Sequence, residues 1–93
     1  MEKNYVQKAL DILNEESPDL DPELAKLYAL LALTLGPSTN LEDVHDAWAI
    51  WRNVTNPAHK SLIPFEDLSG QVRELDQPYV DAIKRTARRL ANV

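Results

Sequence analysis

Six prolines divide this 93-residue chain into stretches whose lengths suit helices. Proline is tolerated in the first turn of a helix or outside it, and it breaks a helix interior. Pro18, Pro37 and Pro57 are therefore expected to end helices, whereas Pro22 and Pro78 stand where new helices begin. Between them apolar residues recur at intervals of three and four, and no run alternates long enough for a confident strand. This pattern predicts an all-α fold of about four helices.

The first expected helix covers about residues 3–15 and ends before Ser17-Pro18. One apolar stripe along it is formed by Val6, Ala9, Leu10 and Leu13. Together with the second helix it is expected to form a helical hairpin over residues 1–36. This hairpin either covers the rest of the chain or meets a second copy.

The second helix should begin after the cap residue Asp21 and end at Gly36, which suits a left-handed turn. Its inner face is expected to comprise Leu24, Leu27, Tyr28, Leu31 and Leu35. Leu30 and Leu33 lie off that face. A helix that is apolar on more than one side is either central in its fold or covered by a partner. Leu30 and Leu33 are therefore candidate interface residues, including for a homodimer. Trp51 of the third helix is a further candidate, because tryptophan is favoured at interface hot spots.

The third helix is expected over about residues 41–54, with two rival caps. Thr39 followed by Glu42 fits a capping box, and Asn40 can cap instead. The apolar stripe of this helix comprises Leu41, Val44, Trp48 and Trp51, widened by Ala47 and Val54.

Residues 57–75 should form a compact irregular segment before the last helix. In it, Phe65-Glu66-Asp67-Leu68 suits a single helical turn, and Ser69-Gly70 reads as another turn. Asp76 is expected to cap the last helix. We expect a single domain over residues 1–93, in which the hairpin packs on a unit at residues 41–91.

Charge is distributed unevenly along the chain. Residues 1–46 hold three Lys/Arg against ten Asp/Glu, and residues 47–93 hold seven against five. An acidic first half would repel phosphates, so nucleic acid is not expected as a partner. The absence of cysteine excludes disulfides and thiolate metal sites and fits a reducing compartment. The charged N-terminus is unlike a secretory signal and no stretch suits a membrane span, so a cytoplasmic location is expected.

Residues for catalysis are scarce in this sequence. His45 and His59 are the two histidines, and Glu42 lies one helical turn before His45. That pair could be half of a metal site, but acidic residues also gather at helix starts because of the helix dipole, and we favour this second interpretation. Two glycines in the whole chain exclude phosphate-cradling loops. We therefore expect no catalytic residue, no metal ligand and no cofactor, and predict that the chain is not an enzyme.

Four basic residues crowd the end of the last helix: Lys84, Arg85, Arg88 and Arg89. They could form a nucleic-acid patch, or a solvated helix end that complements the dipole. The acidic remainder of the chain favours the second interpretation.

Three segments stand in an order that resembles a known family. They are Val44-His45-Asp46-Ala47-Trp48-Ala49, then Leu62-Ile63-Pro64-Phe65-Glu66-Asp67-Leu68, then Leu75-Asp76-Gln77-Pro78-Tyr79-Val80. This arrangement resembles the RyR domain, the module repeated in ryanodine receptors and also found alone in bacterial and phage proteins. The resemblance covers about residues 41–90 and implies an RyR-like unit of helix, irregular segment and helix.

The resemblance leaves two roles open for six residues: His45, Trp48, Pro64, Phe65, Asp76 and Tyr79. In a structural role, Trp48 packs under Pro64-Phe65 and His45 hydrogen-bonds the backbone of that irregular stretch. In a functional role, the aromatic residues among them rim a pocket for a nucleotide-type ligand. We favour the structural role, since aromatics at helical spacing usually serve the core.

The same motifs, in so short a chain, also resemble small early-region proteins of actinobacterial phages, such as mycobacterial phages. That resemblance implies a phage-encoded binding protein that interacts with a bacterial host protein and modulates host physiology or growth. The alternative is an RyR-like module that senses a nucleotide-type small molecule.

Overall fold

Helices account for all the regular structure in the computed structural model, which describes residues 3–92. The four long helices are α1 (Tyr5–Glu16), α2 (Pro22–Thr34), α3 (Leu41–Thr55) and α5 (Gln77–Ala91). The short elements are 3₁₀ turns at Gly36–Ser38 and Phe65–Asp67 and the helix α4 (Gly70–Glu74). The all-α prediction is confirmed, and the four long helices lie where the sequence places them.

The first long helices begin and end where local chemistry dictates. Asn4 caps α1 by accepting the Gln7 amide at 2.8 Å, and Asp21 caps α2 by accepting the Glu23 amide at 2.9 Å. Gly36 follows α2 with a φ of 57°, as expected for a left-handed stop. A Cβ at Gly36 would lie 3.8 Å from the Cβ of Ala87, so backbone conformation rather than space requires glycine there.

The rivalry between the two caps of α3 is settled in favour of Asn40. Its side chain accepts the Asp43 amide at 3.0 Å, and the Asp43 carboxylate accepts the Asn40 amide at 2.9 Å. Thr39 instead is buried and donates its hydroxyl to the Gly36 carbonyl at 2.8 Å. The capping box is therefore Asn40 with Asp43, one residue later than the Thr39–Glu42 alternative.

The expected turn at Ser69-Gly70 is wrong, because a short helix begins there. The Ser69 hydroxyl accepts the Val72 amide at 3.3 Å and caps α4. Serine at such a position caps a helix as readily as it forms a turn, so the two possibilities share one sequence signal.

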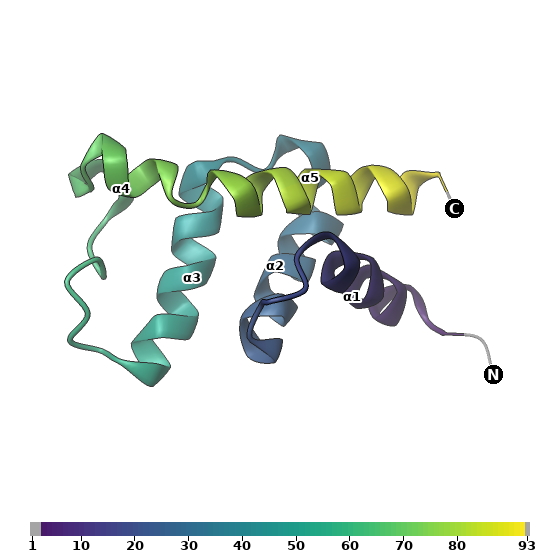
Figure 1. Cartoon of the computed structure of the whole chain (residues 1–93), viewed down its shortest axis with the longest axis horizontal. Coiled ribbons are helices and arrows are strands. Elements are labelled where there is room, and N and C mark those ends of the chain that lie inside the picture. Colours follow the sequence, from purple (N-terminus) through teal and green to yellow (C-terminus); the bar gives the residue numbers. More distant parts are fainter. Residues whose placement is uncertain (1–2, 93) are drawn as a thin grey trace.

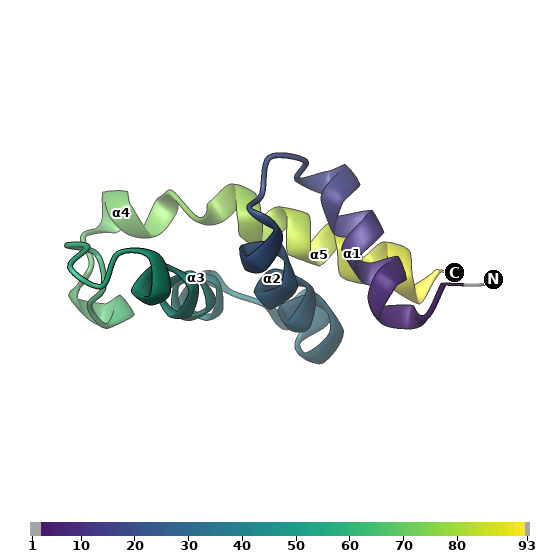
Figure 2. The same ribbon diagram turned by 90° about the horizontal axis from the view of Figure 1, so that it is seen from below.

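Figure 1 shows α5 running along the length of the molecule, with α2 and α3 crossing beneath it. Helix α2 contacts α1, α3 and α5, and α1 also packs against α5. Seen from below, in Figure 2, α3 and α4 lie toward one end and α1 lies toward the other. The result is an elongated body of 43 × 24 × 20 Å.

The core lies where α1, α2, α3 and α5 meet. Its buried members are Ala9, Leu13, Leu24, Tyr28, Ala29, Ala32, Val44, Ala47, Val80 and Ile83. The expected inner face of α2 is partly wrong, because Ala29 and Ala32 are buried whereas Leu35 is 41 % exposed. Since α2 has neighbours on several sides, its small alanines face them and allow close approach. None of the helices over residues 3–92 is long and apolar enough to cross a bilayer.

Candidate functional site

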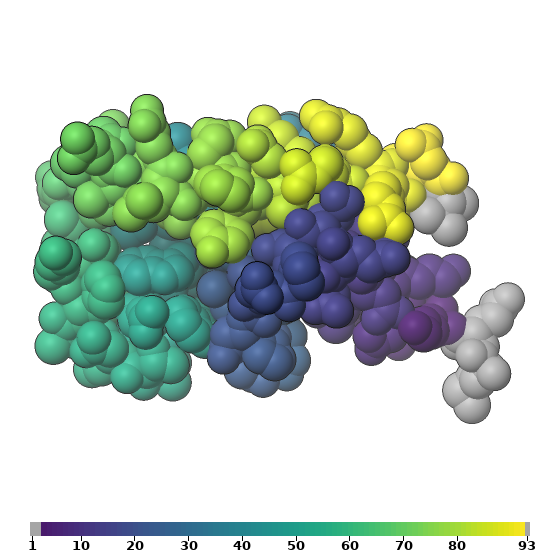
Figure 3. All heavy atoms as spheres, in the orientation of Figure 1, coloured from purple at the N-terminus to yellow at the C-terminus, as the bar shows by residue number. Residues whose placement is uncertain are grey.

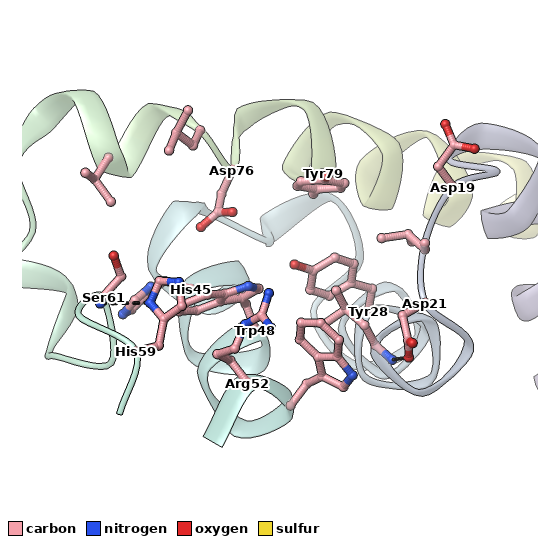
Figure 4. A pocket seen from close by; sticks show the side chains of 15 residues that line it. Asp19, Asp21, Tyr28, His45, Trp48, Arg52, His59, Ser61, Asp76 and Tyr79 are labelled. Carbon is pink, nitrogen blue, oxygen red and sulfur yellow. Dashed lines mark hydrogen bonds between the residues drawn. The ribbon is translucent and has the colours of Figure 1, made fainter. Parts of the chain in front are cut away.

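A cleft of about 590 Å³ opens between α2, α3 and the start of α5. The space-filling view shows a hollow between α3 and α5 (Figure 3). Its lining comes from five parts of the chain: Asp19, Leu20, Asp21, Leu24, Tyr28, His45, Trp48, Trp51, Arg52, His59, Ser61, Val72, Leu75, Asp76 and Tyr79. Four aromatic rings and several polar groups therefore share one concave space (Figure 4).

Helix α3 supplies the aromatic wall of the cleft. The Trp48 ring lies 5.7 Å from the His45 ring in a stacked arrangement and 5.1 Å from the His59 ring edge-on. The Arg52 guanidinium lies over the Trp51 ring at 4.5 Å and 5.8 Å from the Trp48 ring. Because residues three and four apart on a helix are neighbours, Trp48, Trp51 and Arg52 form one surface.

His45 makes the backbone contact that the sequence predicts for it. It is 3 % exposed, and its Nε2 donates to the carbonyl of Ile63 at 2.8 Å. The carbonyl can only accept, so Nε2 carries the proton and Nδ1 is the remaining nitrogen of the ring. This bond ties the irregular segment after α3 back onto α3.

Asp76 does not cap α5, contrary to the sequence prediction. Its backbone is helical, with φ −90° and ψ −3°, and its side chain makes no capping bond. The reason is that α4 runs almost directly into α5, with the Asp76 amide already donating to the Arg73 carbonyl at 3.3 Å. The Asp76 carboxylate instead points into the cleft above His45 (Figure 4). Burial raises the pKa of Asp76 above its ordinary value, and His45 partly offsets that increase.

Tyr28 is the residue of the cleft that sequence reasoning missed. Its side chain is 1 % exposed, and its hydroxyl has no hydrogen-bond partner among the described residues. Figure 4 shows this hydroxyl directed toward the space beneath Asp76. The Tyr79 ring lies 5.8 Å away. Burial raises the pKa of the Tyr28 hydroxyl far above its ordinary value, with Asp76 and then Tyr79 adding to the effect. In the sequence, Tyr28 is one more member of an apolar helix face, and nothing marks its hydroxyl.

The six residues singled out by the resemblance separate into two groups. His45, Trp48, Asp76 and Tyr79 line the cleft, whereas Pro64 and Phe65 do not. The Phe65 ring lies 6.3 Å from the His45 ring and carries the Arg73 guanidinium at 4.6 Å. Trp48 pairs with His45 and His59, and the ring of α3 that lies beside Phe65 is that of His45.

Comparison with known families finds one family model that matches most of this chain. A family model described as a domain of unknown function, DUF7701, matches residues 4–88. The chain belongs to the DUF7701 family. Neither a curated protein nor a solved structure matches it. The match spans α1 to most of α5, so the cleft is built entirely from residues within the DUF7701 region.

The basic cluster of this DUF7701 chain is largely committed to its own fold. Arg85 Nε donates to Glu16 at 2.9 Å, and Arg89 Nη2 donates to Glu15 at 2.9 Å. Lys84 is half-buried and lines a small surface depression together with Phe65, and Arg88 is exposed. The helix end therefore binds α1 through ion pairs, which removes two of the four charges from any free patch.

The candidate interface residues also lie in different places in this chain. Leu30 is 53 % exposed and Leu33 is 38 % exposed on α2. Trp51 lines the cleft beneath Arg52.

Over residues 3–92 there is no cluster of three or more His, Cys, Asp or Glu side chains able to hold a metal ion.

Arg52 and His59 are further cleft residues to which the sequence analysis assigned no role there. Arg52 follows Trp48 by four positions, a spacing that places a guanidinium and a tryptophan on the same face of a helix. His59 Nδ1 accepts the Ser61 amide at 3.0 Å, and no local pattern in the sequence signals that turn.

Proposed function

We propose that this DUF7701 chain is a non-catalytic binding module whose cleft takes a small planar ligand of nucleotide type. The cleft volume of about 590 Å³ falls within the roughly 300–1,000 Å³ typical of small-molecule sites. The observation that carries the proposal is the buried Tyr28 hydroxyl, which faces this cleft without a hydrogen-bond partner among the described residues. Buried polar groups without partners are rare and call for an explanation, and a bound ligand supplies one.

The walls of the cleft favour a planar and anionic molecule. Trp48, Trp51 and Tyr79 line the cleft with aromatic rings, against which a planar base can pack. Arg52 adds a guanidinium, the group best suited to phosphate, and its Nε is buried without a partner among the described residues. The resemblance of residues 41–90 to RyR domains supports the same ligand class.

The test is a thermal-shift screen of the full chain against nucleoside mono-, di- and triphosphates. A ligand at 100 times its dissociation constant adds about 2.7 kcal/mol, a shift on the order of 10 °C for a domain of this size. Arg52→Gln should abolish the ligand-induced shift. Arg88→Gln, at an exposed position outside the cleft, should leave the shift unchanged. If no nucleotide moves the wild-type transition, the proposal fails.

A second candidate is a phage-encoded protein that binds a bacterial host protein in the host cytoplasm. It is supported by three exposed leucines on or next to α2, namely Leu30, Leu33 and Leu35. Exposed apolar side chains on one helix are a common basis for protein contacts. In a tagged pull-down from host lysate, wild type should retain one dominant host protein and Leu30→Glu should not. Equal recovery with both would count against this surface.

A further inference from the structure

Three polar groups from three helices face the same part of the cleft. They are the Tyr28 hydroxyl of α2, the His45 ring of α3 and the Asp76 carboxylate at the start of α5 (Figure 4). No hydrogen bond joins any two of them within the part of the chain that the structure describes. We call these three groups the polar floor of the cleft.

The protein leaves each of these groups with free hydrogen-bonding capacity toward the cleft. His45 Nε2 is already bound to the Ile63 carbonyl, so Nδ1 is the ring nitrogen that is left without a protein partner among the described residues. Asp76 has no capping role, and its carboxylate accepts hydrogen bonds when ionised. The Tyr28 hydroxyl can donate or accept. The floor therefore presents the Asp76 acceptor beside the Tyr28 hydroxyl, which can take either role, with the remaining ring nitrogen of His45 next to them.

We propose that the polar floor selects a planar heterocycle that carries an exocyclic amino group next to a ring nitrogen. The amino N–H donates to the Asp76 carboxylate, and the ring nitrogen accepts from the Tyr28 hydroxyl. This inference rests on the proposed function and narrows its ligand to bases of the adenine or cytosine type. A base with a carbonyl oxygen and a ring N–H at the corresponding positions places acceptor against acceptor at Asp76.

The chemical basis of this selection is the cost of unpaired buried polar groups. A site built to hydrogen-bond a substrate N–H rejects the analogue that lacks it, because its own buried groups are left without partners. Tyr28 is already in that position without a ligand, since it is 1 % exposed and its hydroxyl has no partner within residues 3–92. The ligand that fits is the one that satisfies this hydroxyl and Asp76 together.

The first experiment compares matched nucleotides by isothermal titration calorimetry on the full chain. AMP and IMP differ in the amino or oxo group at one position of the base and its adjoining ring proton, and CMP and UMP differ in the same way. The amino member of at least one pair should bind about tenfold or more tightly than its oxo partner. If the oxo members bind equally well or better, this inference is overturned while the proposed function stands. If none of the four binds, this inference is overturned, and the proposed function falls with it only if the wider nucleotide screen is also blank.

The second experiment removes single groups of the floor. Tyr28→Phe should weaken binding of the amino nucleotide about tenfold while leaving the free protein as stable as wild type or more so, since an unpartnered buried hydroxyl is lost. Tyr5→Phe, at a 70 % exposed tyrosine of α1, is the matched control and should change neither. Unchanged affinity in Tyr28→Phe would mean that water rather than ligand meets this hydroxyl, and would overturn the inference.

A third variant tests Asp76 separately. Asp76→Asn replaces an acceptor-only group with an amide that both donates and accepts, so the preference for the amino nucleotide should shrink about tenfold. A preference that stays intact in Asp76→Asn would remove Asp76 from the recognition site.

Discussion

His45 joins two parts of the chain that lie eighteen positions apart. Its ring contacts Trp48 and Phe65, and its Nε2 holds the Ile63 carbonyl. A histidine on an otherwise apolar helix stripe usually serves the core, and here it also orders an irregular segment. At the residue scale, the cleft depends on such polar contacts because the segment after α3 has no secondary structure to satisfy its backbone.

Replacing His45 should therefore loosen the segment that follows α3. We expect His45→Phe to lower the free energy of unfolding by about 1–3 kcal/mol, because the Ile63 carbonyl loses its donor. His45→Gln keeps a donor at a similar reach and should lose less. Urea denaturation of the three proteins measures the difference. Equal stability of wild type and His45→Phe would show that the bond contributes nothing.

Asp76 gives a pH dependence of defined sign. Burial raises its pKa in the folded state above the unfolded value, so the folded protein holds this proton more tightly. The protonated form of Asp76 therefore favours the folded state. This contribution to the free energy of unfolding is fully present below the ordinary pKa of 3.8 and is lost as the pH rises through the pKa of Asp76 in the folded protein. Asp76→Asn should consequently be more stable than wild type at pH 7, and the difference should vanish at low pH. Urea titrations at several pH values measure it, with the exposed Asp67→Asn as control.

Local capping side chains set where the long helices α1, α2 and α3 begin. Capping requires only a side chain and amides two or three residues away, so Asn4, Asp21 and Asn40 act through their own neighbours. The helix that escaped prediction, α4, has only five residues. Its short run of sequence carries no helical period, and its contact with α3 supports it.

The capping box of α3 yields a prediction at the element scale. Asn40→Ala should lower the free energy of unfolding by about 0.5–2 kcal/mol, since it removes the acceptor of the Asp43 amide. Ser38→Ala, at an exposed position without a capping role for α3, should have little effect. Thermal or urea unfolding followed by circular dichroism tests both. A larger loss in Ser38→Ala than in Asn40→Ala would contradict the assignment.

Two features belong to the whole molecule: the cleft between α2, α3 and the start of α5, and the exposed leucines on α2. Helix α2 is central, with α1, α3 and α5 against it, yet Leu30 and Leu33 remain at the surface. The central position explains part of the apolar character of α2, and the exposed Leu30 and Leu33 remain the candidate interface residues. A surface of this kind affects association more than folding.

A charged side chain introduced at this surface should prevent association without preventing folding. We expect Leu30→Glu and Leu33→Glu to abolish self-association of the chain while changing the free energy of unfolding by less than about 0.5 kcal/mol. Light scattering after size exclusion, together with thermal unfolding, measures both properties. Leu13→Glu, at a fully buried position, serves as the contrast and should unfold the protein. Loss of folding in the α2 variants would mean that these leucines belong to the core.

The helices of this protein were predictable from the sequence because their determinants are local. Apolar spacing, a proline in the first turn of α2 and a glycine after its end act over four residues or fewer. The ion pairs of Arg85 and Arg89 with α1 and the burial of the Tyr28 hydroxyl depend instead on residues far apart in sequence. The place of the Asp76 carboxylate in the cleft also depends on tertiary packing, because the cleft forms where the start of α5 meets α3. Such features arise only when the helices pack, because the packing, and not the chain order, brings together side chains from residue 19 to residue 79.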